Sequence, residues 1–275
     1  MSLSREFRLQ GEEFGVQVDL FSRELDRILA QAQRATLAEV DEKLSTDSVG
    51  VFLRTRTNVI RARRVGEIFS RNLFAFGYSD LVNKFVSGFD GQFNSFGRIL
   101  NELKPTLKFS RPPVFSAKDI EILVVEKLKQ AKILEVAVSE VAQDVNRKML
   151  TDFAGSKKTA LQSVLVTEFA RLPSTARTIA TTGISTHFRT LADAGYRQIE
   201  KDLGRRLKFT YDGPDDVLTR PWCHRMLALA ASGKVWTRAQ IASLVSDKDR
   251  GTSQPRNVLL TGGGWGCRHQ FLPGK

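Results

Sequence analysis

Cysteine is the rarest residue of this 275-residue chain, which has only Cys223 and Cys267. Two cysteines are too few for a disulfide scaffold, so they fit a reducing compartment with one optional pair. No apolar run approaches the length of a membrane-spanning helix. The first residues, MSLSREFRLQGEEF, lack the apolar stretch of a signal peptide. We therefore expect neither a transmembrane helix nor a signal peptide.

Negative charge is also in short supply, since 30 Asp and Glu face 42 Lys and Arg, for a formal net charge of +12. This excess favours contact with something anionic, such as nucleic acid, an acidic protein surface or a membrane face. Hydrophobic residues make up 41% of the chain, which is enough to bury a core and excludes wholesale disorder. The length suggests one large domain or two smaller ones.

Apolar residues recur every three or four positions in three long stretches, which predicts helices over 17–45, 120–149 and about 174–203. Three prolines within 105–115 predict a linker or an extended crossing. The expected apolar face of the first helix consists of Phe21, Leu25, Ile28, Leu29, Ala32, Val40 and Leu44. That of the second consists of Ile120, Leu123, Val124, Leu128, Ala131, Leu134, Val138, Val141, Val145 and Met149.

The stretch 51–104 is rich in Phe and Arg and is interrupted by glycines. One interpretation is a set of short helices with Phe in the core and Arg in solvent. The other is that its arginines form a patch for DNA phosphates or an acidic partner. The residues of this arginine patch are Arg54, Arg56, Arg61, Arg63 and Arg64.

The pattern changes after Gly204. Residues 207–211 alternate apolar and polar side chains, which predicts a strand, and Pro221 fits the first turn of a short helix. Thr237 and Gln240 form a capping box, and 265–272 read as a last extended segment. We expect a mainly α protein, with an elongated helical region over 1–205, a break near 105–115, and a small α+β module over 206–275. All three Trp, both Cys and two of the three His lie in this module.

Cys223, Cys267 and His269, with His224 or water as a fourth ligand, are the candidates for a metal site, because zinc accepts mixed Cys and His ligands. The spacing argues against it, since Cys223 and His224 are adjacent and Cys-x-His is shorter than a zinc-knuckle spacing. The alternative is that both cysteines pack as small hydrophobic residues. We assign no metal ligand and no cofactor.

The glycines of the tail GGGWGCRHQFLPGK allow a tight backbone path beside the helix that carries Cys223. A nucleophilic Cys–His enzyme would also need an orienting third group and an oxyanion hole, and the sequence assigns neither, so we name no catalytic residue. We expect the tail to close a small core made of Trp265, Cys267, Phe271, Leu272, Trp222 and Trp236.

Two segments carry a resemblance to a known family: DDVLTRPWCHRMLALAASGKVWTRAQIASL and GGGWGCRHQFLPGK. In order and spacing they resemble the C-terminal module of phage minor head proteins, the head-morphogenesis proteins of the Mu-F-like type. The resemblance covers roughly the last 100 residues. The positions that match as a structural motif are Asp216, Thr219, Pro221, Cys223, Trp236, Gly264, Cys267, Arg268 and His269.

The resemblance implies a structural virion protein of a tailed phage, without enzymatic activity, that acts in head morphogenesis and is a candidate for a role in DNA ejection. The implied partners are the portal protein and other copies of the chain, with packaged DNA as a further candidate and no membrane in the assembled state. The implied location is the head interior or the portal vertex, and the host cytoplasm during assembly. Two alternatives stay open: a head-to-tail adaptor ring, and a head-carried enzyme or toxin-like effector that uses the C-terminal module.

Overall fold

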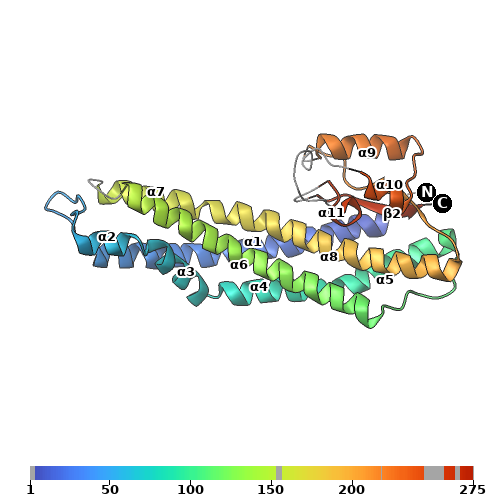
Figure 1. Cartoon of the computed structure of the whole chain (residues 1–275), viewed down its shortest axis with the longest axis horizontal. Helices are drawn as coiled ribbons and strands as arrows, with labels where there is room; N and C mark the ends of the chain where they lie inside the picture. The colour runs from blue at the N-terminus through green and yellow to red at the C-terminus, as the bar shows by residue number, and fades with distance from the viewer. Residues whose placement is uncertain (1–3, 153–156, 218, 245–256, 264–266, 275) are drawn as a thin grey trace. The chain divides into compact units, whose positions relative to one another are not determined.

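The computed structural model describes residues 4–152, 157–217, 219–244, 257–263 and 267–274. Helices dominate these residues, which contain a single sheet of two strands (Figure 1). The mainly α fold class is thereby confirmed, together with a small α+β region near the C-terminus. None of the helices in this part of the chain combines the length and the apolar character that crossing a membrane requires.

The elements in chain order are α1 (Ser4–Lys43), α2 (Arg56–Ala62), α3 (Val65–Ala75), α4 (Tyr78–Ser87), the 3-10 helix η1 (Gly88–Gly91), α5 (Gln92–Leu107), α6 (Ala117–Asp152), α7 (Lys158–Phe169), α8 (Arg171–Leu203), β1 (Lys208–Asp212), α9 (Pro221–Ala231), α10 (Arg238–Ala242), α11 (Val258–Thr261) and β2 (Gln270–Gly274).

The chain divides into two compact units, each assembled from separate segments. Unit 1 consists of Met1–Gln17, Val86–Gln130 and Thr178–Lys275, and unit 2 of Val18–Phe85 and Ala131–Arg177. Helices α1, α4, α6 and α8 therefore each contribute residues to both units. A separate domain over 206–275 and an elongated shape of the helical region stay predictions.

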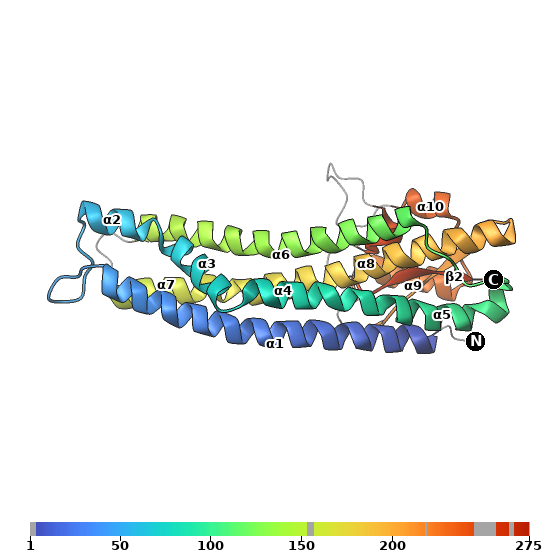
Figure 2. The same cartoon turned by 90° about the horizontal axis from the view of Figure 1, so that it is seen from below.

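Unit 2 has a helical core to which α1 contributes one apolar face. The seven residues expected on that face, from Phe21 to Leu44, are all buried, although the helix begins at Ser4. Figure 2 shows α2, α3 and α4 as consecutive short helices, as expected for the Phe- and Arg-rich stretch. The ring of Phe69 stacks on that of Phe169 with 3.9 Å between centroids, and such stacking adds to the burial of the two rings.

The buried line of α6 differs from the expected one. Leu123, Leu134, Val138, Val145 and Met149 are buried as expected. The prediction was wrong for Ile120, Val124 and Leu128, which are 41%, 48% and 63% exposed. We call these three residues the α6 stripe. These three follow one another at steps of four, beside the buried line. Val124, for example, follows the buried Leu123 by one residue and is therefore displaced from it by roughly 100° around the helix.

The expected break over 105–115 begins later than the prolines suggested. Pro105 lies inside α5, which continues to Leu107. Leu103 and Leu107 are buried, and their burial offsets the backbone hydrogen bond that a proline removes. Lys108 caps the end of the helix: its N–H donates to the carbonyl of Lys104 at 2.8 Å, and its left-handed backbone turns the chain away from the helix.

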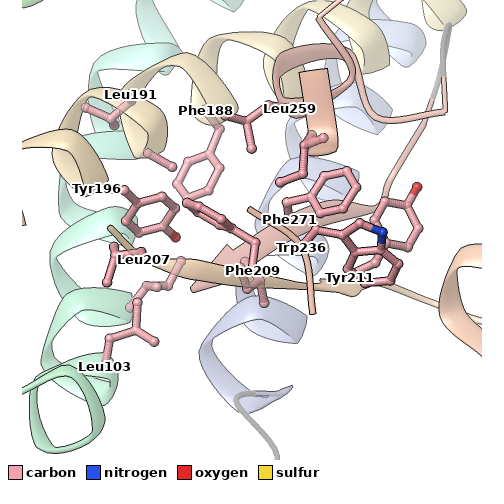
Figure 3. Packing of buried hydrophobic residues seen from close by; sticks show 14 of the residues in the cluster. Leu103, Phe188, Leu191, Tyr196, Leu207, Phe209, Tyr211, Trp236, Leu259 and Phe271 are labelled. Atoms are coloured by element: carbon pink, nitrogen blue, oxygen red, sulfur yellow. The ribbon is translucent and has the colours of Figure 1, made fainter. Parts of the chain in front are cut away.

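Unit 1 has a mixed core in which the small sheet packs with helical residues. β1 and β2 pair antiparallel, in a register that runs from Lys208 opposite Gly274 to Asp212 opposite Gln270. The capping box at the start of α10 is confirmed, and Trp236 exchanges two 2.8 Å backbone hydrogen bonds with Phe209. Figure 3 shows the core residues close together; those labelled are Leu103, Phe188, Leu191, Tyr196, Leu207, Phe209, Tyr211, Trp236, Leu259 and Phe271.

Candidate functional site

Two segments of unit 1 bring two thiols and one imidazole together. Cys223 lies in α9, while Cys267 and His269 lie just before β2. The Sγ atoms of the two cysteines are 3.9 Å apart, and Sγ of Cys267 is 3.8 Å from Nδ1 of His269. The three ligand-type atoms all lie within 4.8 Å of one another, and all three residues are buried. We call this group the Cys–His cluster.

The start of α9 determines which side chains face the cluster. Pro221 occupies the first helical turn, where its missing N–H leaves no helical hydrogen bond unmade. Cys223 and Met226, three positions apart, then share the buried face of the helix. His224 comes one position after Cys223 and points to solvent, where its Nδ1 lies 2.6 Å from an Asp215 carboxylate oxygen. His224 is therefore outside the cluster.

The ring of His269 is held in one orientation. Its Nε2 lies 2.7 Å from the carbonyl oxygen of Pro214, which can only accept, so Nε2 carries the hydrogen. The ring stacks on Tyr211 with 5.6 Å between centroids and 6° between planes. A Cβ at residue 213 would come within 2.5 Å of this ring, so the turn needs Gly213. Nδ1 of His269 consequently faces Sγ of Cys267.

The loop that supplies the Pro214 carbonyl is fixed by residues of the structural motif. The hydroxyl of Thr219 donates to Pro214 O at 2.8 Å and accepts from the backbone N–H of Asp216 at 3.0 Å. Arg268 donates two hydrogen bonds, of 2.9 and 2.6 Å, to the two carboxylate oxygens of Asp216. Asp216, Thr219 and Arg268 thus hold the acceptor that orients His269.

Both sulfurs have hydrogen-bond donors of their own. The backbone N–H of Gly263 lies 3.0 Å from Sγ of Cys267, and the Tyr211 hydroxyl donates to Sγ of Cys223 at 3.4 Å. A Cβ at position 263 would lie 2.7 Å from Sγ of Cys223, so this close approach requires glycine. Gly263 therefore allows a tight backbone path beside α9, as the sequence predicted for the glycines of the tail.

The two thiols differ in their acidity because they share a hydrogen bond. The bond from Cys223 lowers the pKa of Cys267 well below its ordinary value against the effect of burial, and His269 and Arg189 lower it further. The same shared bond, together with burial, raises the pKa of Cys223. Cys267 is therefore the thiol that ionises first.

Arg189, on α8, is the residue that the sequence analysis missed. It is buried, and its guanidinium donates to the carbonyl oxygens of Cys267 and His269 at 2.6 and 2.7 Å and to that of Leu260 at 3.3 Å. Charge-assisted hydrogen bonds of this kind are strong and directional. The signal in the sequence was a lone arginine among residues 178–191, which otherwise contain no Asp, Glu, Lys or Arg.

The remaining motif and tail residues divide into those that join the core and those outside the described part. The expected tail core is confirmed for Trp222, Trp236, Cys267, Phe271 and Leu272, which all belong to one buried cluster. Gly264 and Trp265 lie outside the described residues.

The geometry differs from the arrangement that a Cys–His nucleophilic enzyme needs. The carboxylate of Asp216 binds Arg268, while His269 is oriented by a backbone carbonyl instead of a carboxylate. Cys223 and Cys267 are 1% and 4% exposed, so a substrate would have no direct access to either sulfur in this conformation.

The arginine patch lies in unit 2, around α2. All five of its arginines are exposed, whereas Asn58 and Ala62 form the buried side of α2. The guanidinium of Arg61 donates to the carbonyl of Lys43. Within the described residues no ion pair involves any arginine of the patch, and the sequence has no acidic residue between Asp47 and Glu67. The patch therefore presents uncompensated positive charge to solvent, and its contact with phosphate stays a prediction.

Comparisons with known proteins add no relative to this geometry. No protein-family model, no curated protein and no solved structure matches the chain.

Proposed function

We propose that this chain is a structural component of a tailed-phage head, located at the portal vertex and active in head morphogenesis. The observation that carries the proposal is the connection among the residues that resemble phage minor head proteins. Asp216 and Arg268, 52 positions apart, form a bidentate pair, and Cys223 contacts Cys267 across 44 positions. Such a connected set supports reading the motif as one folded module.

Two surfaces support a role in assembly. The α6 stripe leaves three large apolar side chains in solvent on one ridge of a helix. Exposed apolar side chains grouped in this way are typical of protein contacts, and we assign this stripe to the portal protein or to a neighbouring copy. The arginine patch would neutralise phosphates of packaged DNA close to the portal. Both assignments follow from the phage proposal.

The experiment uses the phage or prophage genome that encodes the chain. Heads are purified before and after DNA packaging, and their proteins are identified by mass spectrometry. We expect the chain in both kinds of particle and expect its gene deletion to reduce the yield of infectious particles. Absence of the chain from every particle would refute the proposal. Its presence only in DNA-filled heads would indicate the adaptor ring instead.

A variant of the stripe tests the mechanism. Val124→Lys with Leu128→Lys places charge on exposed positions, so the fold should persist while incorporation into heads falls. Leu229→Lys is the matched control, because Leu229 is 47% exposed and lies on α9, outside the stripe. Equal incorporation of both variants would exclude the α6 stripe as the contact surface.

A further inference from the structure

The Cys–His cluster has the dimensions of a metal-ligand set. Zinc binds thiolate sulfur at about 2.3 Å and imidazole nitrogen at about 2.0 Å. A tetrahedral ion therefore separates two sulfurs by about 3.8 Å and a sulfur from a nitrogen by about 3.5 Å. The corresponding distances here are 3.9 Å between the sulfurs of Cys223 and Cys267, and 3.8 Å from Cys267 to His269. These two distances match a shared ion to within a few tenths of an ångström, and all three ligand atoms lie within 4.8 Å of one another.

The surroundings of the cluster match those that orient metal ligands. A metal-bound histidine donates its second N–H to a carbonyl or carboxylate, which fixes the ring and leaves the other nitrogen for the metal. His269 does this with Pro214. The N–H of Gly263 and the hydroxyl of Tyr211 point to the two sulfurs, where they would stabilise thiolates. Donors that hydrogen-bond to the ligands in this way orient them and tune their affinity for a metal.

Charge near the cluster also favours thiolates. The buried guanidinium of Arg189 holds the backbone of both Cys267 and His269.

We propose that Cys223, Cys267 and His269 bind one Zn²⁺ ion. Two thiolates and one imidazole form a soft to borderline ligand set, which binds zinc in preference to magnesium or calcium. A water molecule takes the fourth position. The ion ties the start of α9 to the segment before β2, so its role is to stabilise unit 1. The zinc site depends on the local geometry alone and is independent of the phage proposal.

A disulfide between the cysteines is the main rival. It would require a sulfur separation of about 2.05 Å, far shorter than the 3.9 Å observed, and both cysteines are free here. It would also leave the oriented Nδ1 of His269 without a role. Two reduced thiols in simple contact are the other rival, and they predict a protein that is indifferent to zinc.

The test begins with the full chain, produced in zinc-supplemented medium and purified without chelators. We expect elemental analysis to find close to one equivalent of zinc. Removal of the ion by a chelator should lower the melting temperature, and added Zn²⁺, but not Mg²⁺, should restore it, because a ligand that binds only the folded state stabilises it. Replacement by Co²⁺ should give the charge-transfer absorption of thiolate ligands.

Variants distinguish the proposed ligands from their neighbours. Cys267→Ser and His269→Gln should lose the metal, whereas His224→Gln should keep it, since His224 is exposed and faces Asp215. If the ligand variants fail to fold, the chelation and cobalt measurements on the unaltered chain still decide. A chain without bound zinc whose melting temperature ignores added zinc would overturn the proposal. So would full zinc content in the Cys267→Ser variant, or an intact disulfide found by mass spectrometry.

Discussion

Replacing His187 by glutamine should make the stability of the protein less sensitive to mild acid. His187 is buried in unit 1, where its Nδ1 lies 2.6 Å from Oε1 of Gln92 and its ring packs on Phe89 at 5.0 Å between centroids. The pKa of His187 is lowered to about 4, mainly by burial and also by Lys127, while Asp90 opposes the shift. The folded protein therefore holds this imidazole neutral.

The sign of the pH effect follows from the lowered pKa. The unfolded chain binds a proton at His187 below about pH 6.5, whereas the folded chain does so only near pH 4. Stability from this group is fully present above the unfolded pKa and is lost as the pH falls. Between about pH 7 and pH 5 the free energy of unfolding should drop by about 2 kcal/mol through this residue alone.

The assay is urea unfolding followed by far-UV circular dichroism at a series of pH values. His187→Gln keeps a side-chain donor for Gln92 but does not titrate, so its stability should decline less over the same interval. His224→Gln is the control, because that histidine is exposed. If the His187→Gln variant and the unaltered chain lose the same stability, the reasoning about the buried imidazole is refuted.

Four further outcomes are expected. Arg189→Met should lower the free energy of unfolding by roughly 3–5 kcal/mol, because three buried carbonyls lose their donor. A decrease below about 1 kcal/mol in a urea titration would contradict a stabilising role for these three hydrogen bonds. Gly263→Ala should lower the free energy of unfolding by about 1–3 kcal/mol through steric overlap. Gly97→Ala should raise it by about 0.5–1 kcal/mol, because a Cβ at this helical position meets nothing within 4 Å. Thermal unfolding compares the two variants. Arg268→Ala should lower the free energy of unfolding by less than about 1 kcal/mol in the same measurement, since the ion pair of Arg268 with Asp216 is partly exposed. Replacing the five arginines of the patch by glutamine should make the plot of log binding constant for DNA against log salt concentration less steep. The slope should fall by roughly 0.9 for each phosphate that an arginine had neutralised, and an unchanged slope would exclude the patch as a DNA contact.

The sequence predicted burial best where apolar residues at helical spacing lie on a single face of a helix. The apolar face of α1 is uniform, and every residue predicted on it from Phe21 to Leu44 is buried. Periodicity was insufficient for α6, because a helix with apolar residues on adjoining faces does not reveal which face is covered. Leu123 is buried while Val124, the next residue, is 48% exposed. The choice depends on neighbours that local spacing does not specify.

The candidate site was predictable in its members but not in its geometry. The rarity of cysteine and the order of the motif pointed to Cys223, Cys267 and His269. Spacing rules for zinc sites expect close pairs of ligands along the chain. Here α9 carries one of the three side chains, and the segment before β2 carries the other two. Arg189 escaped notice because its partners are backbone carbonyls 71 to 80 positions away. Backbone acceptors carry no residue-specific signal, so only the fold reveals such a contact.

The discontinuous make-up of the two units has a consequence for the order of folding during synthesis. All segments of unit 2 precede residue 178, so its core can form while the rest of the chain is still being translated. Unit 1 needs its first segment, its middle segment and β2, whose strand partner lies more than 50 positions earlier. Pairings across such long separations are slow to form because loop closure must come first. The ribosome therefore delivers β2 after every segment of unit 2 has been synthesised, so β2 can pair with β1 only after the whole of unit 2 has been translated.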